Sequence, residues 1–140
     1  MFELDYRLKN DCVCIGSLPL CTLLLMKDAN YPWLILVPQR SDVSEIYQLD
    51  ADDQEQLIWE SSFIAERLMA EFDGDKINIA ALGNVVPQLH IHHVVRMRSD
   101  AAWPKPVWGA VPAQAYGAGE LEQRVAQLAA AFVTSTFRPA

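Results

Sequence analysis

The sequence has little positive charge, and this shortage excludes two classes of partner. Its 140 residues include 11 Lys and Arg against 18 Asp and Glu, which gives a formal net charge of −7. Negative charge opposes long-range attraction to nucleic acid polymers and to anionic membranes, so we expect neither as a partner. A small anionic ligand is compatible with it, because backbone N–H groups, amides and histidine can hold one phosphate locally.

Cysteines and long apolar runs are also scarce. Cys12, Cys14 and Cys21 form an odd set without the C-x-x-C spacing of redox and zinc motifs, so we expect reduced thiols with a structural role. The longest apolar runs, at residues 23–26 and 33–37, are far too short to cross a bilayer. The N-terminus lacks the basic and then apolar layout of a signal peptide, so we expect a cytoplasmic protein.

Length and composition indicate one globular domain. The chain is 51% hydrophobic and 21% charged, as ordinary globular proteins are. A chain of this size can bury a substantial core, and no repeat, low-complexity stretch or linker divides it. We predict a single domain over residues 1–140, with a motif-bearing core at about 12–109 and a C-terminal tail and helix at 110–140.

The first forty residues carry the pattern of three strands. Residues 11–16 and 20–26 are apolar runs separated by a turn-like Ser-Leu-Pro sequence, which predicts a β-hairpin. Residues 33–37 are apolar throughout and end at Pro38, which cannot donate to a β-ladder. We expect this third strand to lie at the centre of a sheet.

The middle of the chain predicts a long helix followed by two antiparallel strands. Asp50 can act as the N-cap of the helix and Gly74 as its stop, and apolar residues recur between them at helical spacing. Residues 76–81 return to strand character, and a Gly-Asn bend leads into residues 88–96 as the partner strand.

The C-terminal third predicts an irregular tail and a second helix. Residues 102–109 hold two prolines that prevent regular structure and two tryptophans that need burial. The tail can lie over its own subunit, or it can complete the surface of a neighbouring subunit. Apolar residues at helical spacing then predict an amphipathic helix over residues 121–132, and we expect residues 137–140 to fray.

All three histidines lie within residues 88–96, where polar and apolar residues alternate. Successive side chains of a strand point to opposite faces, so Gln88, His90 and His92 share one face. His93 has the opposite parity, and we interpret it as a structural or surface histidine.

Two kinds of chemistry fit His90 and His92 on one face. A metal site needs a third and fourth ligand, which only His93, the distant cysteines and scattered carboxylates can supply. A nucleophile needs a largely neutral imidazole and a second group to orient it. We favour a nucleophile with a helper in phosphoryl or nucleotidyl transfer, without a metal or a cofactor. Arg96 shares the parity of this face, but an arginine at a strand end more often forms a surface ion pair.

The sequence GNVVPQLHIHHVVR, Gly83–Arg96, resembles the histidine triad (HIT) motif, in which histidines alternate with apolar residues. The first histidine of that motif is Gln88 here. Other features agree in order: an upstream Asp28, a strand ending in LVPQR, a long middle helix, and Asn78 on the strand before the motif. The resemblance covers roughly residues 12–109, and the tryptophan-containing tail looks like that of a bacterial diadenosine tetraphosphate hydrolase-like subgroup.

The resemblance implies an α+β fold with a five-stranded antiparallel sheet, a long middle helix and a C-terminal helix, usually in a homodimer. It also implies an enzyme, a nucleotide hydrolase or nucleotidyl transferase, that binds a purine nucleotide or dinucleoside polyphosphate and cleaves it at the α-phosphate. His90 matches the family's nucleophile, which would form a nucleotidyl-histidine that water hydrolyses. His92 matches the last histidine, which hydrogen-bonds the phosphate or the leaving group.

Substrate-binding residues follow from the same resemblance. Asp28 matches the acid that holds the ribose hydroxyls, and Met26 falls where apolar residues line the base pocket. Asn78 matches an amide near the phosphate, and Asn84 takes the place of a common glutamine. Asp28 can equally cap a turn, and the two asparagines can satisfy backbone groups.

Two departures from the family's pattern bear on turnover. Gln88 can donate and accept hydrogen bonds but cannot carry a proton at neutral pH. Trp33 stands where the family has an upstream histidine, which would remove a second polar orienting group. The alternative function is therefore a nucleotide-binding or regulatory protein with little catalytic turnover.

Overall fold

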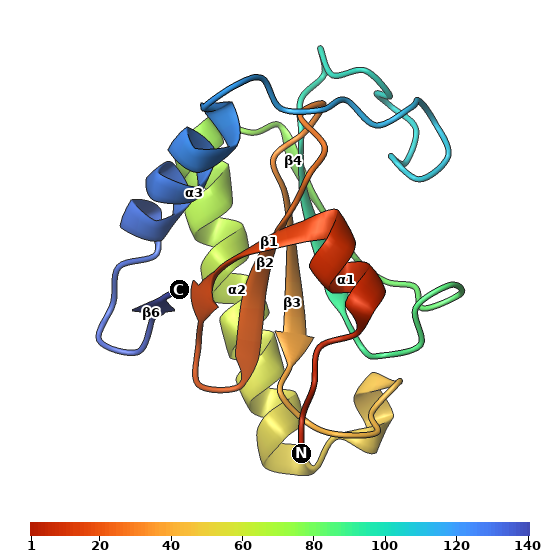
Figure 1. Ribbon diagram of the computed structural model, residues 1–140, viewed down its shortest axis with the longest axis vertical. Coiled ribbons are helices and arrows are strands. Elements are labelled where there is room, and N and C mark those ends of the chain that lie inside the picture. The colour runs from red at the N-terminus through yellow and green to blue at the C-terminus, as the bar shows by residue number, and fades with distance from the viewer.

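Six antiparallel strands form one sheet in the computed structural model, which describes residues 1–140 (Figure 1). Their order across the sheet is β4-β5-β3-β2-β1-β6. The strands are β1 (Cys12–Ser17), β2 (Cys21–Met26), β3 (Trp33–Pro38), β4 (Lys76–Ala81), β5 (Ile91–Arg96) and β6 (Arg138–Pro139). The α+β class and the antiparallel sheet are confirmed, whereas the expected number of five strands is wrong.

The sixth strand lies at the C-terminus, where the sequence predicts fraying. Phe137 is buried and packs against Phe132, with ring centroids 6.1 Å apart. This packing brings β6 against β1, and the backbone N–H of Ala140 donates to the carbonyl of Ile15 at 3.0 Å. One apolar residue in a short polar segment is too weak a signal to predict such a strand.

Three α-helices and one short 3-10 helix accompany the sheet. They are α1 (Tyr6–Asp11), η1 (Ile46–Gln48), α2 (Ala51–Phe72) and α3 (Glu120–Ala131). The long helix begins as predicted, because the Asp50 side chain accepts the backbone N–H of Asp53. The sequence does not predict α1, whose six residues bury only Leu8 and so show no apolar period. None of the helices has the length and apolar character needed to span a bilayer.

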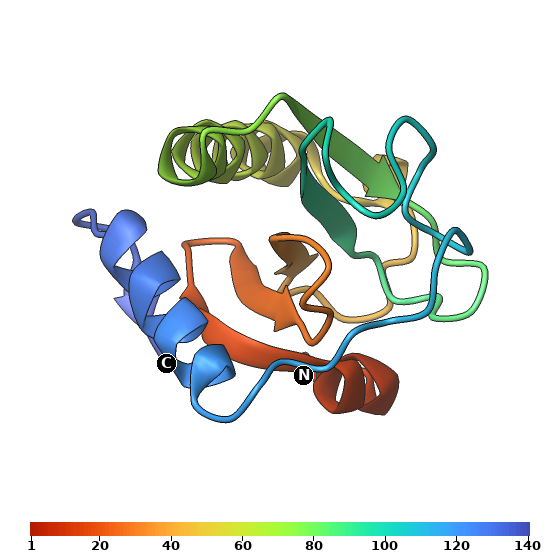
Figure 2. The same ribbon diagram turned by 90° about the horizontal axis from the view of Figure 1, so that it is seen from above.

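Neighbouring residues of one strand alternate between two apolar faces of the sheet. One face packs against α2 and α3 (Figure 2), with Ile64, Leu68 and Leu128 in a shared core. The other face is covered by α1 and by the segment 102–107, in a second core. All six residues of β5 are buried, so this strand has no solvent face.

β5 begins later than the sequence predicts. Ala81 of β4 pairs with Ile91, and residues 82–90 form the loop between the two strands. Pro87 within this loop has no N–H and cannot extend the ladder. His90 therefore lies at the end of a loop, while His92 lies on the strand.

Arg96 is buried, so its interpretation as a surface ion-pair residue is wrong. It is 2% exposed, and its guanidinium donates to both carboxylate oxygens of Asp100 at 2.8 and 3.1 Å and to Oδ1 of Asn78 at 2.8 Å. Burial acts to raise the pKa of Asp100, but hydrogen bonds from Arg96 and from three backbone N–H groups lower it to about 2. The ion pair and the Asn78 contact satisfy the buried guanidinium with hydrogen bonds.

The tail lies over its own chain, which is the first of the two interpretations above. Ala102 and Val107 are buried in the second core. Further along, Asp28 accepts the backbone N–H of Gln114 at 3.2 Å and so ties the tail to the loop before β3.

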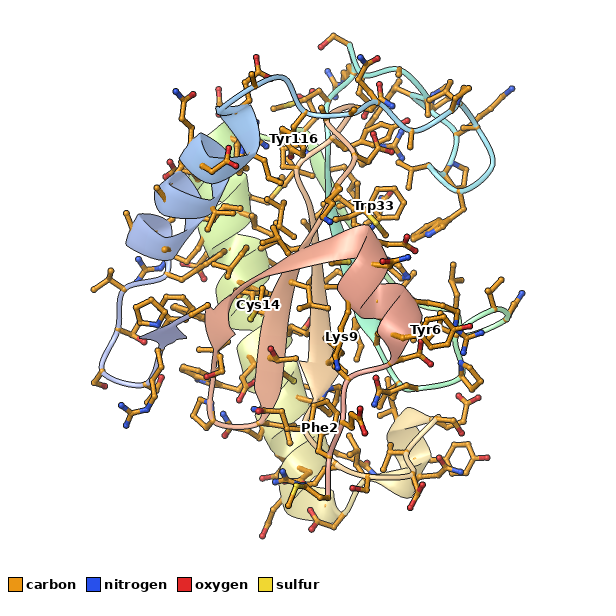
Figure 3. The ribbon with its side chains drawn as sticks, viewed as in Figure 1. Phe2, Tyr6, Lys9, Cys14, Trp33 and Tyr116 are labelled. Carbon is orange, nitrogen blue, oxygen red and sulfur yellow. The ribbon has the colours of Figure 1, made fainter.

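The three cysteines are free thiols, as predicted. Cys12 and Cys21 are buried, and burial raises the pKa of Cys12 to about 12. Cys14 is exposed on β1 (Figure 3), so it has no packing role.

Candidate active site

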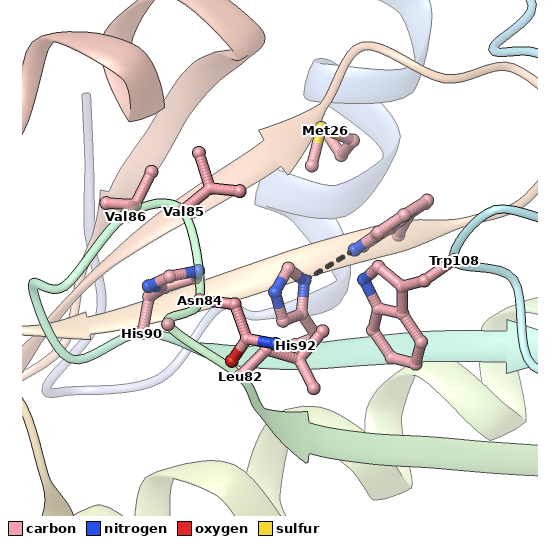
Figure 4. A pocket seen from close by; sticks show the side chains of 10 residues that line it. Met26, Leu82, Asn84, Val85, Val86, His90, His92 and Trp108 are labelled. Carbon is pink, nitrogen blue, oxygen red and sulfur yellow. Dashed lines mark hydrogen bonds between the residues drawn. The ribbon is translucent and has the colours of Figure 1, made fainter.

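A pocket opens on the face of the sheet opposite α2, beside β2, β3 and β5 (Figure 4). Its volume is about 220 Å³. Four of the predicted site residues meet there: His90, His92, Asn84 and Met26. The complete lining is Met26, Trp33, Leu82, Gly83, Asn84, Val85, Val86, His90, His92 and Trp108.

His90 is held in the tautomer that a nucleophile needs. Its Nδ1 lies 2.7 Å from the backbone carbonyl oxygen of Gln88. Because a carbonyl only accepts hydrogen bonds, Nδ1 carries the proton and donates it. The neutral ring then has its lone pair on Nε2, the nitrogen that can attack an electrophile.

His92 is oriented by Trp33, so the expectation that Trp33 removes an orienting group is wrong. The indole N–H donates to Nδ1 of His92 at 3.0 Å (Figure 4). Because an indole N–H only donates, the proton of the neutral imidazole lies on Nε2. Burial, with smaller contributions from His90 and His93, lowers the pKa of His92 to about 3. At neutral pH His92 is therefore an uncharged hydrogen-bond donor.

Trp108 of the tail packs against this pair. Its ring lies at 78° to His92 with centroids 5.2 Å apart, and at 87° to Trp33 with centroids 5.8 Å apart. Figure 4 shows His92 between His90 and Trp108, and the two histidine centroids are 5.0 Å apart. Trp108 packs, as the sequence suggests, but it also forms a wall of the pocket.

The loop after β4 forms the opposite wall. Gly83 has φ of 91°, in the left-handed region that glycine adopts without strain. Asn84 supplies the one side-chain amide of the lining, between the apolar side chains of Leu82 and Val85. No Lys or Arg lines the pocket, so its possible anion contacts are uncharged donors and histidine.

Gln88 does not line this pocket, although its parity predicts that it shares a face with His90. Its side-chain oxygen accepts the backbone N–H of Asp5 at 2.9 Å, and its side-chain nitrogen donates to the carbonyl of Glu3 at 2.9 Å. The loop geometry before β5 turns the amide toward the N-terminal segment, because strand parity does not apply to residue 88.

Asp28 and Asn78 also lie outside the pocket lining. Oδ1 of Asp28 accepts the backbone N–H groups of Asn30 and Gln114 at 3.0 and 3.2 Å, which favours the turn-capping alternative. Oδ1 of Asn78 accepts from Arg96, which favours a structural role. Their substrate-binding roles stay predictions.

His93 is a structural histidine on the opposite face, as its parity predicts. It is fully buried, its Nδ1–H donates to the carbonyl of Ile91 at 3.0 Å, and its Nε2 accepts the Ser61 hydroxyl at 2.7 Å. Burial lowers its pKa to about 4. The Ser61 contact joins β5 to α2.

The expected site residues do not include Trp108 or the wall residues Leu82, Val85 and Val86, although by the resemblance Val85 takes the place of a residue that often binds phosphate. The three wall residues flank Asn84, so closeness to the motif is a signal that could have suggested them. No comparable signal exists for Trp108, because its approach depends on how the tail turns back at Asp100.

The histidines do not form a recognisable metal centre. No group of three or more His, Cys, Asp or Glu side chains is arranged to hold a metal ion. His90 and His92 each use Nδ1 in a hydrogen bond, so the pair has two ring nitrogens left, whereas zinc sites take three or four protein ligands.

Comparisons with known proteins agree with this geometry. The family model described as HIT domain matches residues 7–99. A histidine triad protein from Bradyrhizobium japonicum has 48% sequence identity and a TM-score of 0.91, covering 94% of this chain and 98% of its own. One from Marinobacter aquaeolei VT8 has 47% identity and a TM-score of 0.91, covering 94% and 96%. One from Sinorhizobium meliloti 1021 has 44% identity and a TM-score of 0.88, covering 91% and 95%. No curated protein matches.

Acidification is expected to destabilise the fold through His92 and His93. In the unfolded chain both bind protons as the pH falls through about 6.5, whereas in the folded protein their pKa values are about 3 and about 4. The unfolded state therefore gains protons first as the pH falls. Below pH 6.5, each of the two histidines lowers the free energy of unfolding by up to about 1.4 kcal/mol for each pH unit. Urea titrations between pH 7 and pH 4.5 measure this slope. A slope that His93→Asn leaves unchanged would contradict it.

Replacing Trp33 by Phe removes the indole N–H but keeps an aromatic ring. Nδ1 of His92 then loses its donor, so we expect a mixture of tautomers and a loss of about 1 kcal/mol in the free energy of unfolding. Ring ¹⁵N chemical shifts report the tautomer. Trp59→Phe is the matched control, because Trp59 is exposed on α2 and stacks on Phe63. If His92 kept one tautomer in Trp33→Phe, the orienting role would be refuted.

Proposed function

The chain belongs to the histidine triad family, whose members are generally nucleotide hydrolases or transferases, and from this premise we propose that it cleaves a nucleotide at the α-phosphate through a nucleotidyl-histidine on His90. The proposed substrates are purine nucleotides and dinucleoside polyphosphates such as diadenosine tetraphosphate. One observation carries the proposal: the Gln88 carbonyl accepts the Nδ1–H of His90, a residue of the pocket lining, so that the lone pair of the neutral ring lies on Nε2.

The reaction has two steps. Nε2 of His90 attacks the α-phosphorus, the P–N bond forms, and the bond to the leaving-group oxygen breaks with its electron pair on that oxygen. The ring keeps its Nδ1 proton throughout, and the Gln88 carbonyl stabilises the positive charge of the phosphorylated imidazole. Water then attacks the phosphorus, the P–N electron pair returns to Nε2, and the water's proton leaves to solvent. The products are a nucleoside monophosphate and the leaving group.

The absence of a general acid favours a leaving group of low basicity. Gln88 cannot act as an acid, and the pKa of His92 at about 3 means that at neutral pH its ring lacks the acidic second proton of an imidazolium. A polyphosphate departs as an anion and needs no general acid. This argument supports a dinucleoside polyphosphate or a nucleoside polyphosphate over an ester of a basic alcohol.

Uncharged donors would hold the phosphate oxygens. His92 offers its Nε2–H and Asn84 its amide, and preorganised dipoles of this kind act strongly in a site with little water. Met26, Leu82 and Val85 supply apolar contacts for a base. Asp28 and Asn78 would take part only by exchanging their present partners in the protein for substrate atoms.

A nucleotide-binding or regulatory role with little turnover is the second candidate. The absence of a proton carrier at Gln88 and the low pKa of His92 both favour it, because product release and hydrolysis of the intermediate would lack acid–base assistance.

Replacing His90 by Asn is expected to abolish the covalent intermediate. Intact-protein mass spectrometry after incubation with a nucleotide panel should show a nucleotidyl adduct on the wild-type chain and none on His90→Asn. His92→Asn is the matched control, because it keeps the nucleophile and should still form the adduct, about 100-fold more slowly. An adduct on His90→Asn would refute the assignment.

Calorimetry separates the two candidate functions. AMP, GMP and diadenosine tetraphosphate are titrated into the wild-type protein, and the same ligands are followed in a hydrolysis assay. Tight binding with release of a monophosphate supports the enzyme, whereas tight binding without adduct or product supports the regulatory role.

We also propose that the chain forms a homodimer. β4 lies at the edge of the sheet, and its apolar residue Ile79 is 49% exposed. An edge strand with exposed apolar side chains is a natural surface for a second copy.

Sedimentation equilibrium tests the dimer. The wild-type chain should have twice the 15.7 kDa mass of one chain, and Ile79→Lys should shift it to the monomer because a buried charge opposes association. Val133→Lys, at an exposed residue after α3, is the matched control. A monomeric wild-type chain would contradict this proposal.

A further inference from the structure

Both polar atoms of the Gln88 side chain are hydrogen-bonded to the N-terminal segment. Its oxygen accepts from the backbone N–H of Asp5, and its nitrogen donates to the carbonyl of Glu3, both at 2.9 Å. Two backbone groups of an extended segment are thus paired with one carboxamide, which presents a donor and an acceptor side by side. An imidazole has one donor and one acceptor on separate edges of its ring, so histidine at position 88 could not make both bonds in this geometry.

A second tie joins the same segment to the pocket wall. The Arg7 guanidinium donates to the carbonyl of Val85 at 2.9 Å. Arg7 is itself held by the Asp5 carboxylate, with an ion-pair distance of 2.9 Å, and Asp5 also caps α1 through the Arg7 backbone N–H. Residues 3–7 therefore hold the loop at two points, residue 85 and residue 88. The neighbouring Tyr6 of α1 is exposed (Figure 3).

Gln88 also touches the nucleophile through its backbone. Its carbonyl oxygen accepts the Nδ1–H of His90 at 2.7 Å. The peptide that fixes the His90 ring therefore belongs to a residue whose side chain is anchored. Glu3 and Asp5 lie before residue 7, where the match to the HIT domain begins, so the anchor comes from outside the matched region.

We propose that Gln88 is a positioning residue for His90, acting through its side-chain anchor on the N-terminal segment rather than through contact with substrate. The anchor fixes the plane of the residue 88 peptide, and that peptide fixes the tautomer and direction of His90. At the first position of the triad motif, this chain therefore has an amide with a structural role where the motif has a titratable imidazole. This inference rests on the proposed function for its consequence in catalysis, but the ring geometry is testable without it.

Full-length variants test the anchor, first as single substitutions. Gln88→Ala removes both hydrogen bonds. Asp5→Pro removes the N–H that Gln88 accepts, and proline suits this position because φ of Asp5 is −55°. Asp5→Ala loses the same carboxylate but keeps the N–H, so it is the matched control. Gln127→Ala removes another amide, which bonds Glu71 at the surface, and is the control for a generic loss of a glutamine.

The first readout is the ring of His90 in the free protein. In the wild-type chain the ¹⁵N shifts should report the Nδ1–H tautomer. In Gln88→Ala and Asp5→Pro the Nε2–H tautomer should become populated to a greater extent than in Asp5→Ala, which loses the same carboxylate, while Gln127→Ala stays close to wild type. An unchanged His90 ring in Gln88→Ala overturns the proposal, whether or not the protein proves to be an enzyme.

The second readout is the rate of adduct formation on His90 at saturating nucleotide. We expect Gln88→Ala and Asp5→Pro each to lower it about tenfold, the double variant to be no slower than either, and nucleotide affinity by calorimetry to change less than threefold. A merely structural role would lower the melting temperature without changing the rate per folded molecule. Additive losses in the double variant, or a faster rate in Gln88→His, overturn the proposal. If the wild-type chain forms no adduct, the proposed function is refuted. The ¹⁵N measurement of the His90 tautomer then still tests the positioning role of Gln88.

Discussion

Complete burial of β5 is the constraint on which the site depends. Three of its six residues, His92, His93 and Arg96, carry polar side chains, and a buried polar group without a partner costs free energy. Each finds its partner in a different part of the fold: β3 supplies Trp33, α2 supplies Ser61 and the turn between β5 and the tail supplies Asp100. One strand thereby fixes the relative positions of the sheet, the long helix and the tail.

The same constraint separates the histidines by role. His92 and His93 are adjacent, point to opposite faces and are uncharged because both are desolvated. Both ring nitrogens of His93 are hydrogen-bonded within the protein. His92 and His90 each use only Nδ1 in such a bond, which leaves Nε2 available to a ligand. The structural histidine, His93, thus makes two hydrogen bonds with the protein, whereas each of the two proposed site histidines makes one.

Features with a local pattern could be predicted from the sequence. The Asp50 cap and the apolar spacing after it predict α2, and strand parity assigns His92 and His93 to opposite faces. Features that depend on distant segments could not. Trp33 and His92 are 59 residues apart, and Asp5 and Gln88 are 83 apart. Strand parity does not predict the direction of the Gln88 side chain, because the ladder of β5 begins only at Ile91. The resemblance to the HIT motif predicts which histidine is the nucleophile, but only the tertiary contacts show what orients each ring.

The tie between Asp28 and Gln114 has a consequence for the order in which the site is completed. A chain made from its N-terminus contains both pocket histidines well before it contains Trp108, and the tail is fastened only when Gln114 has followed. Until Trp108 is in place, His92 lacks one of its aromatic neighbours and is less desolvated. The part of the pocket wall that Trp108 forms is therefore the last part to be synthesised. The tail thus supplies a part of the pocket that the histidine motif does not contain.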